Sequence, residues 1–458
     1  MSKLVEFISS LNDNIIWGTP MVILMISVGT FLTLITKGIL FRRFNIVMRY
    51  TLFTLFRKSS CSNSDDSITP FQAVCTALAA TVGTGNIVGV ALAIATGGPG
   101  AIFWLWISAL LGMVVKYCEV LLSVAYRTIN KKGEIVGGPM YYIAKGFGAK
   151  RLAFLFSIFG AIAAFGIGAS VQANSLAVNI NHSFRIPTNF IGILLAILSA
   201  LVLVGGIRRI ASVTEFLVPF MAVFYIVSAI VVLLINSPVL PVAFAAIFKS
   251  AFTGTAATGG FCGASVMYAC KIGMARGVFT HEAGMGSAPI AHASATTDHP
   301  ARQGLWGAFE VFIDSMVMCT ITGLVILTSG LWYSIPMMNG GAMSSAAFDA
   351  AFRGGKYVIT IGLTLFAFAT IIAWYYYGEK CVEYLFQENC IAVRIYQLVY
   401  IVFVYIGCVT NLSTVWEFAD LFNGLMAIPN LIALIVLSPI IKRLTEDFFT
   451  NYPSASSK

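Results

Sequence analysis

The amino-acid sequence predicts an all-α, polytopic membrane protein with eleven transmembrane helices. Three observations support this: the composition, the spacing of the apolar stretches, and the distribution of basic residues between successive loops. Of 458 residues, 58% are hydrophobic and only 10% are charged, whereas soluble domains carry about 25% charged residues. The composition therefore excludes a soluble multidomain enzyme and a nucleic-acid-binding domain.

The apolar stretches give the number of spans. A helix needs about 20 mostly apolar residues to cross a bilayer. Eleven stretches of about this length lie near 15–36, 70–96, 101–126, 151–180, 188–204, 213–235, 249–271, 303–331, 355–378, 394–410 and 413–441. The nine cysteines form no CxxC pair, and most lie within these stretches, as expected of small buried residues.

The basic residues give the orientation, because cytoplasmic loops are enriched in Lys and Arg. If the N-terminus is outside, 22 of the 28 basic residues fall in cytoplasmic segments and five in external ones, with Lys116 inside a span. We therefore expect a multi-pass protein of the cell (inner) membrane, with its N-terminus outside and its C-terminus cytoplasmic. The net charge of +9 then reflects topology and predicts no nucleic-acid partner.

The ten spans after the first divide into two sets of five. An odd number of spans reverses the direction of crossing, so the second set is expected to be inverted, as in many secondary transporters. The predicted organisation is a peripheral helix and basic cytoplasmic loop (1–69), a first five-helix repeat (70–236), a second, inverted repeat (249–443) and a cytoplasmic tail (444–458).

The first helix of each repeat contains the same glycine-rich pattern, AATVGTGNIVG at 79–89 and AATGGFCGAS at 256–265. Gly-interrupted segments at matching positions indicate two broken helices that form a binding site. Close packing of small residues is the alternative, since Gly85 and Gly89 have GxxxG spacing. The ends of half-helices could hold a zwitterion through backbone groups, and residues 70–115 and 250–270 contain no Lys, Arg, Asp or Glu.

Longer blocks resemble the family of alanine or glycine:cation symporters. The segment GGPGAIFWLWISALLG (97–112) is similar to the family signature, with Leu105 where Met is common. Further similar blocks are TALAATVGTGNIVGVA (76–91), GGPMYYIAKG (137–146), ARGVFTHEAGMGSAPIAHASA (275–295) and FATIIAWYYYGEKC (368–381). The chain departs from the family at His281, where Asn is usual before Glu-Ala-Gly.

The resemblance implies a leucine-transporter-like fold and sodium-coupled uptake of alanine, glycine or a similar small neutral amino acid such as serine by alternating access, with proton coupling as the alternative. By position it assigns substrate binding to Thr84, Gly85, Asn86, Gln172, Gly260, Phe261, Gly263 and Trp374. It assigns sodium binding to Ala80, Gly83 and Thr370. It implies a transporter rather than an enzyme, no cofactor, and no metal other than the coupling sodium; its partners are the amino acid, sodium and membrane lipid.

Each polar candidate also has a simpler interpretation. Gln172 could bond a neighbouring helix, Thr370 could bond the i−4 carbonyl of its own helix, and Trp374 could anchor the helix at the membrane interface. An amino-acid channel and an intramembrane enzyme are the alternative functions. However, the chain shows neither a repeated filter sequence nor a nucleophile–base pair at a recognisable spacing.

Several ionisable residues lie inside expected spans, where charge is expensive and commonly functional. Asp314, one turn after Glu310, is expected either to assist an ammonium group or a proton or to pair with the protein. Lys116 and Glu119 are expected to form a structural ion pair. The histidines at 281, 292 and 299, together with Glu282, lack the HExxH spacing of zinc sites, so we predict no zinc site there.

Overall fold

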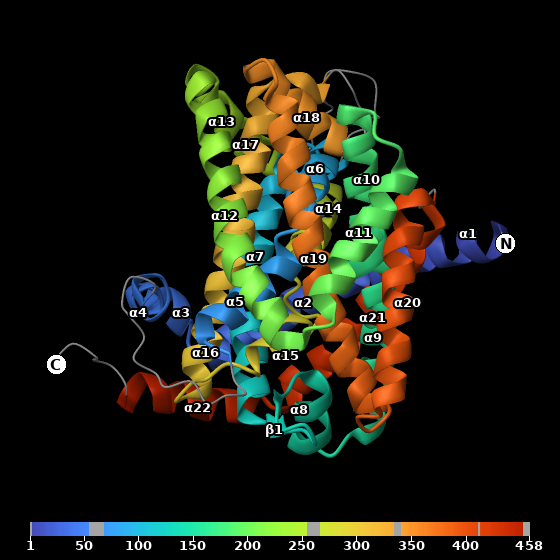
Figure 1. The fold of residues 1–458 in the computed structure, drawn as a ribbon. Helices are drawn as coiled ribbons and strands as arrows, with labels where there is room; N and C mark the ends of the chain where they lie inside the picture. Colours follow the sequence, from blue (N-terminus) through green and yellow to red (C-terminus); the bar gives the residue numbers. More distant parts are fainter. Residues whose placement is uncertain (1, 55–67, 254–265, 334–339, 411–412, 452–458) are drawn as a thin grey trace.

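Helices form nearly all of the computed structural model, which describes residues 2–54, 68–253, 266–333, 340–410 and 413–451 (Figure 1). The one sheet among these residues is a hairpin of β1 (Thr128–Ile129) and β2 (Ile135–Val136). This agrees with the predicted all-α class.

The first half of the chain contains α1 (Ser2–Leu11), α2 (Thr19–Ile35), α3 (Ile39–Arg42), α4 (Phe44–Tyr50), α5 (Pro70–Thr81), the π-helix η3 (Gly85–Gly89), α6 (Val90–Gly97), α7 (Gly100–Ala125), α8 (Pro139–Gly146), α9 (Lys150–Ala163), the π-helix η4 (Ala164–Ser170), α10 (Val171–Phe184), α11 (Thr188–Leu203), α12 (Gly206–Ile235) and α13 (Leu240–Phe252). The short π-helix η1 (Asn12–Ile16) joins α1 to α2.

The second half contains α14 (Val266–His281), α15 (Ala288–His292), α16 (Pro300–Val311), the π-helix η6 (Phe312–Cys319), α17 (Thr320–Thr328), α18 (Gly340–Ala351), α19 (Gly355–Leu385), α20 (Cys390–Val409), α21 (Ser413–Val436) and α22 (Ser438–Asn451). Three short 3₁₀-helices, at Leu52–Thr54, Ser237–Val239 and Leu331–Tyr333, complete the helical elements.

Within the described residues, eight helices are long and apolar enough to cross a membrane, and the bent pair α5–α6 makes a ninth span. These nine correspond to nine of the eleven expected spans. Of the other two, α11 is apolar but has only 16 residues, and the stretch expected at 249–271 includes 254–265, which lie outside the described residues. The count of eleven and the inverted repeat therefore stay predictions.

The first break lies where the glycine-rich sequence predicts it. Thr69 and Gln72 form a capping box at the start of α5, and Pro70 occupies the first turn, where its missing N–H costs nothing. The helix ends at Thr81, and the segment from Gly85 continues at an angle of 48°. The interruption therefore covers residues 82–84.

A second interruption, which the sequence analysis did not predict, separates α14 from α15. The backbone turns into the left-handed region at Glu282 (φ 54°), Gly284 (φ 94°) and Gly286 (φ 80°). Glycine adopts this region freely, whereas a glutamate rarely does. The break expected at 256–265 lies outside the described residues, so the second break seen in the structure is at 282–287.

Segments that the basic residues assign to one side of the membrane lie in the lower part of Figure 1, among them α4, α8, α15, α22 and the β-hairpin. The helices α13 and α18 lie at the upper end. Neither of these two, nor α8 and α22, was predicted, because all four are shorter than the roughly 20 residues of the expected spans. The last of them, α22, crosses the boundary expected at 443/444.

Ion pairs join the β-hairpin to the end of α19. Lys132 lies 3.1 Å from Glu383, and Lys380 lies 2.9 Å from Glu134 and 2.7 Å from Glu383. Burial alone would raise the pKa of the Glu134 carboxyl, but the charge and hydrogen bond of Lys380, together with Asn130 and Lys132, outweigh burial, and the pKa is lowered. Glu134 therefore stays ionised at neutral pH, and its pair with Lys380 helps to hold the hairpin to α19.

The charge distribution predicts that the lower end in Figure 1 faces the cytoplasm. In a background with Cys61, Cys262 and Cys390 replaced by Ser, Asn45→Cys should resist a membrane-impermeant thiol reagent added to intact cells. Ser237→Cys, in the segment before α13, should react. Both positions are in the described structure and Ser237 and Asn45 are exposed. Rapid labelling of Asn45→Cys, without labelling of Ser237→Cys, would show that the protein has the opposite orientation in the membrane.

Candidate substrate and ion site

Both helix breaks border one small cavity in the interior. Its volume is about 10 Å³, close to the space that one ordered water needs. It lies among α5, η4, α10, α14 and α19. Its lining residues are Ala80, Thr81, Gly83, Gly85, Ile167, Gln172, Phe279, Glu282 and Trp374. Five of these nine, Ala80, Gly83, Gly85, Gln172 and Trp374, are residues that the sequence analysis assigned to substrate or ion.

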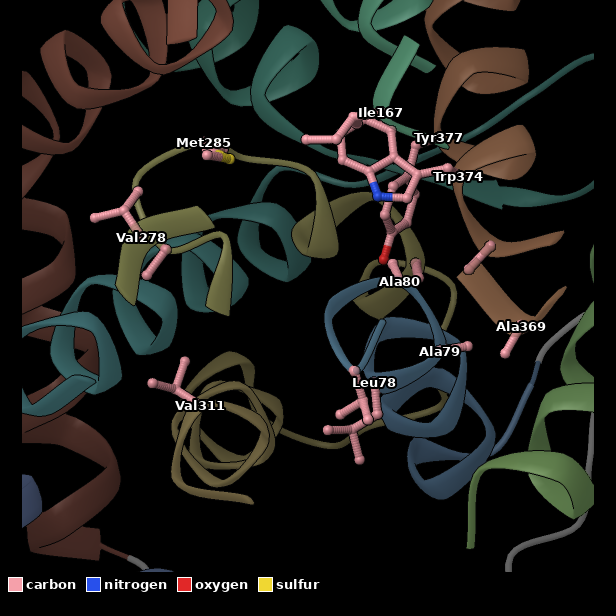
Figure 2. Close-up of a cluster of buried hydrophobic side chains, with 14 of the residues drawn as sticks. Leu78, Ala79, Ala80, Ile167, Val278, Met285, Val311, Ala369, Trp374 and Tyr377 are labelled. Carbon is pink, nitrogen blue, oxygen red and sulfur yellow. The ribbon is translucent and has the colours of Figure 1, made fainter. Parts of the chain in front are cut away.

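The aromatic wall of the cavity comes from α19. In Figure 2 the rings of Trp374 and Tyr377 lie over Ala80, near the end of α5, with Ile167 beside Trp374. The two rings are in edge-on contact, with centroids 5.6 Å apart. Trp374 is 1% exposed, so in this structure it is an interior wall residue and not an interfacial anchor.

Thr370 lies behind Gly83, one turn before Trp374. Its hydroxyl is 2.9 Å from the Ala79 carbonyl oxygen of α5 and 3.0 Å from the Phe366 carbonyl oxygen of its own helix. The i−4 bond is therefore present, and a contact to the broken helix is present as well. Three oxygen atoms thus meet at the C-terminal end of α5, where the helix dipole is negative. Hard cations prefer oxygen ligands of this kind.

Glycine is required at position 83 by this close approach. A Cβ atom there would lie 2.8 Å from Thr370 Oγ1 and 3.5 Å from Gln172 Oε1. The Nε2 amide of Gln172 donates to the Ile167 carbonyl oxygen at 3.1 Å, so Nε2 is bonded to a neighbouring turn of the same segment while Oε1 faces the break. The structure therefore brings Gly83, Thr370 and Gln172 together.

Thr84 has the one hydroxyl in the first break, and no described residue bonds that hydroxyl. Its Oγ1 atom is buried without a hydrogen bond among the described residues. Its backbone N–H is 3.5 Å from Gln172 Oε1, at the upper limit for a hydrogen bond. Buried polar groups are nearly always hydrogen-bonded, so this hydroxyl is suited to a ligand.

Asn86, in contrast, does not line the cavity. Its Oδ1 accepts the Gly83 N–H at 3.0 Å, and its Nδ2 donates to Asp314 Oδ1 at 2.7 Å. The other Asp314 oxygen accepts from Ser315 at 2.7 Å. Asn86 therefore braces the first break against η6. Of the two roles expected for Asp314, the observed contacts favour pairing with the protein.

One wall of the cavity is formed by residues at the second break. Gly260, Phe261 and Gly263 lie outside the described residues, and the wall seen in the structure is formed by Phe279 and Glu282 at the second break. Glu282 Oε1 accepts from Trp374 Nε1 at 3.0 Å, and Oε2 accepts from Ser287. No lysine, arginine or histidine of the described chain forms a salt bridge with Glu282. The sequence signal for this wall was a glutamate followed by two nearby glycines.

The expected ion pair between Lys116 and Glu119 is wrong. Lys116 Nζ lies 3.5 Å from Glu310 Oε1 on α16, and Glu310 Oε2 lies 3.1 Å from His292 Nε2. Glu119 instead accepts from the Gly284 N–H at 2.9 Å and from the Asn430 side chain. Spacing of three residues along a helix allows a pair, but the packing of α7 against α16 and the second break gives both groups nearer partners.

The three histidines considered for zinc lie in separate environments. His281 contacts Ser108 on α7, His292 contacts Glu310 on α16, and His299 contacts Asp447 on α22. Among the described residues, no three His, Cys, Asp or Glu side chains are grouped to hold a metal ion.

Comparison with known proteins shows a similar fold in a solved structure. The structure of MhsT in complex with L-phenylalanine aligns with a TM-score of 0.57 over 84% of this chain and 99% of that chain. The two sequences are 15% identical, so this likeness concerns the fold. A leucine-transporter-like arrangement of the helices is therefore shown.

Sequence comparison decides the family. The model of the sodium:alanine symporter family matches residues 1–458. The chain belongs to this family. It is 44% identical to the sodium/alanine symporter AgcS of Methanococcus maripaludis over 97% of both chains. It is 34% identical to a putative sodium/proton-dependent alanine carrier, YrbD of Bacillus subtilis, over 94% of this chain and 90% of that one. This family member is therefore a multi-pass membrane transporter and not an enzyme.

The close approach at Gly83 gives a testable prediction. Gly83→Ala should reduce amino-acid uptake at least about tenfold, because the added methyl group must displace Thr370 or Gln172. Gly89→Ala is a matched control, since a Cβ atom at Gly89 would meet nothing within 4 Å. Uptake of labelled alanine is measured per amount of membrane-inserted protein. Equal uptake by the two variants would show that Gly83 is not tightly enclosed.

Proposed function

We propose that this protein is a sodium-coupled symporter that imports small neutral amino acids, namely alanine, glycine or a similar one such as serine, across the cell (inner) membrane by alternating access. The observation that carries the proposal is the meeting of two helix breaks at one small, largely uncharged cavity. We further propose eleven spans with the N-terminus outside, and an inverted repeat in which α14–α15 is the counterpart of α5–α6.

We propose that the sodium ion binds at the C-terminal end of α5. Carbonyl oxygens near Ala79, Ala80 and Gly83 and the Thr370 hydroxyl would supply an all-oxygen shell. The contact of 2.9 Å between Thr370 Oγ1 and the Ala79 oxygen supports this placement. Binding of sodium would replace the proton of the hydroxyl as the partner of that carbonyl, with the hydroxyl oxygen turned toward the ion.

We propose that the amino-acid substrate binds between the two helix breaks. Its carboxylate would lie at the N-terminal end of η3, near the Thr84 hydroxyl and the Gly85 N–H, where the helix dipole is positive. Its ammonium group would face Glu282, the one carboxylate in the cavity lining, and Gln172 Oε1. Trp374 would cover the side chain. The wall positions Ala80, Gly83 and Gly85 leave room only for a small side chain.

Sodium and substrate would each raise the affinity for the other, because both hold the two ends of the first break together and binding coupling is reciprocal. Proton coupling is the competing proposal. Its support is the similarity to YrbD, a putative sodium/proton-dependent alanine carrier.

Transport in proteoliposomes tests the function. Purified protein should accumulate labelled alanine above the external concentration when sodium is high outside, and the accumulation should vanish when sodium is replaced by potassium. A proton gradient at equal sodium should drive no accumulation. Accumulation driven by the proton gradient alone would show that protons, and not sodium, are the coupling ion. Passive equilibration of alanine under every gradient would indicate a channel.

Variants of two α19 residues, Thr370 and Trp374, test ion binding and substrate binding separately. Thr370→Val keeps the shape but removes the oxygen, so the sodium concentration for half-maximal uptake should rise about tenfold. Thr370→Ser should change it less than about threefold. Trp374→Ala should instead weaken alanine binding and admit larger side chains. Unchanged sodium dependence in a transporting Thr370→Val variant would remove Thr370 from the ion site.

A further inference from the structure

His281 is buried at the last position of α14, next to the glutamate of the cavity wall. Its side chain is 1% exposed. Nδ1 accepts the N–H of Ala283 at 3.0 Å, and Nε2 lies 3.0 Å from Ser108 Oγ on α7. The ring thus connects the backbone of the second break to a long neighbouring helix.

These contacts fix the tautomer of the ring. Because Nδ1 accepts a backbone N–H, the proton of the neutral imidazole is on Nε2. Nε2 therefore donates to Ser108, whose own hydroxyl is 3.4 Å from the Met274 carbonyl oxygen. The ring is a neutral bridge with one donor and one acceptor, and each has a partner.

The ring is also held sterically. Gly112 of α7 faces it so closely that a Cβ atom there would lie 2.8 Å from Cε1. A ring enclosed in this way, with both nitrogen atoms bonded, keeps the N–H of Ala283 in one place.

Glu282 is the residue between His281 and Ala283, whose N–H the His281 ring accepts. Its backbone adopts φ 54°, an unfavourable conformation for a residue with a Cβ atom, which persists only where the surroundings impose it. The bond from Ala283 N–H to His281 closes a tight turn around Glu282. That turn directs the Glu282 side chain to Trp374 Nε1 and the cavity.

We infer that His281 is a positioning residue of the transport site: its bridge between Ala283 N–H and Ser108 holds the Glu282 carboxylate against the cavity. The inference rests on the proposed function, in which Glu282 faces the substrate ammonium. His281 itself is absent from the cavity lining, so it acts through the backbone of the break.

The test separates positioning from folding. In proteoliposomes, His281→Ala should raise the alanine concentration for half-maximal uptake about tenfold, as expected from a misplaced charged hydrogen bond. His281→Asn should raise it less than about threefold, because an Asn side chain can accept the N–H two residues ahead. The maximal rate per inserted protein should change less than the half-saturation concentration in both variants.

His299→Ala is the matched control. His299 Nδ1 also accepts an N–H two residues ahead, that of Ala301, at 3.1 Å, but it caps α16 away from the cavity. This variant should lose stability or abundance with an unchanged half-saturation concentration for alanine. An equal rise in His299→Ala, or no rise in His281→Ala, would overturn the inference.

Two further measurements keep the result decisive. If the His281→Ala protein does not insert into the membrane, Ser108→Ala is used instead, because it removes only the contact between the ring and α7. Ser108→Ala should raise the alanine concentration for half-maximal uptake about threefold, and an unchanged concentration overturns the inference. Wild-type protein is measured first. Absence of sodium-driven alanine accumulation in the wild type would refute the proposed function, whereas normal accumulation with unaltered His281 variants would refute the inference alone.

Discussion

The structure depends on one constraint: a helix that is interrupted inside a bilayer frees backbone N–H and C=O groups that water cannot reach. Each described break meets this constraint with side chains from other segments. At the first break, Asn86 accepts the Gly83 N–H and Thr370 donates to the Ala79 carbonyl oxygen. At the second, Glu119 accepts the Gly284 N–H, and Asn430 donates to the Gly284 carbonyl oxygen at 2.8 Å. At both breaks, buried polar side chains therefore supply the hydrogen bonds that water cannot.

Much of the fold followed from the sequence because it depends on composition and on segment length. Nine of the expected spans were found, and the first break lies within its glycine-rich segment. The break at 282–287 was not predicted, for a physical reason. Glycine-rich segments occur at both 256–265 and 282–287, and what distinguishes the second is its partners. Asn430 is 146 residues from Gly284, and no local pattern shows such a contact.

The candidate site was predictable to a similar degree. Residues with small side chains or a position on a known motif, such as Gly83 and Trp374, were found because their chemistry is local. Glu282 was considered only as a metal ligand, since its cavity contact depends on a left-handed backbone that the sequence does not reveal. Lys116 was paired with its neighbour on the same helix, whereas tertiary packing places it beside Glu310. Sequence periodicity describes one helix at a time, and buried charges are paired between helices.

The ion pairs between the β-hairpin and α19 differ from the interior ones in their contact with solvent. Lys132 is 43% exposed and Glu134 is 31% exposed, whereas Lys116 and Glu310 are fully buried. The distance beyond which dissolved ions screen exposed charges is about 8–10 Å at physiological ionic strength and falls to about 3 Å at 1 M salt, whereas buried charges are screened much less. Pulling the hairpin away from α19 therefore costs less in concentrated salt than in dilute salt, while the interior pairs are insulated from the medium. The ease with which this end of the molecule loosens is consequently tied to the ionic strength of the compartment it faces.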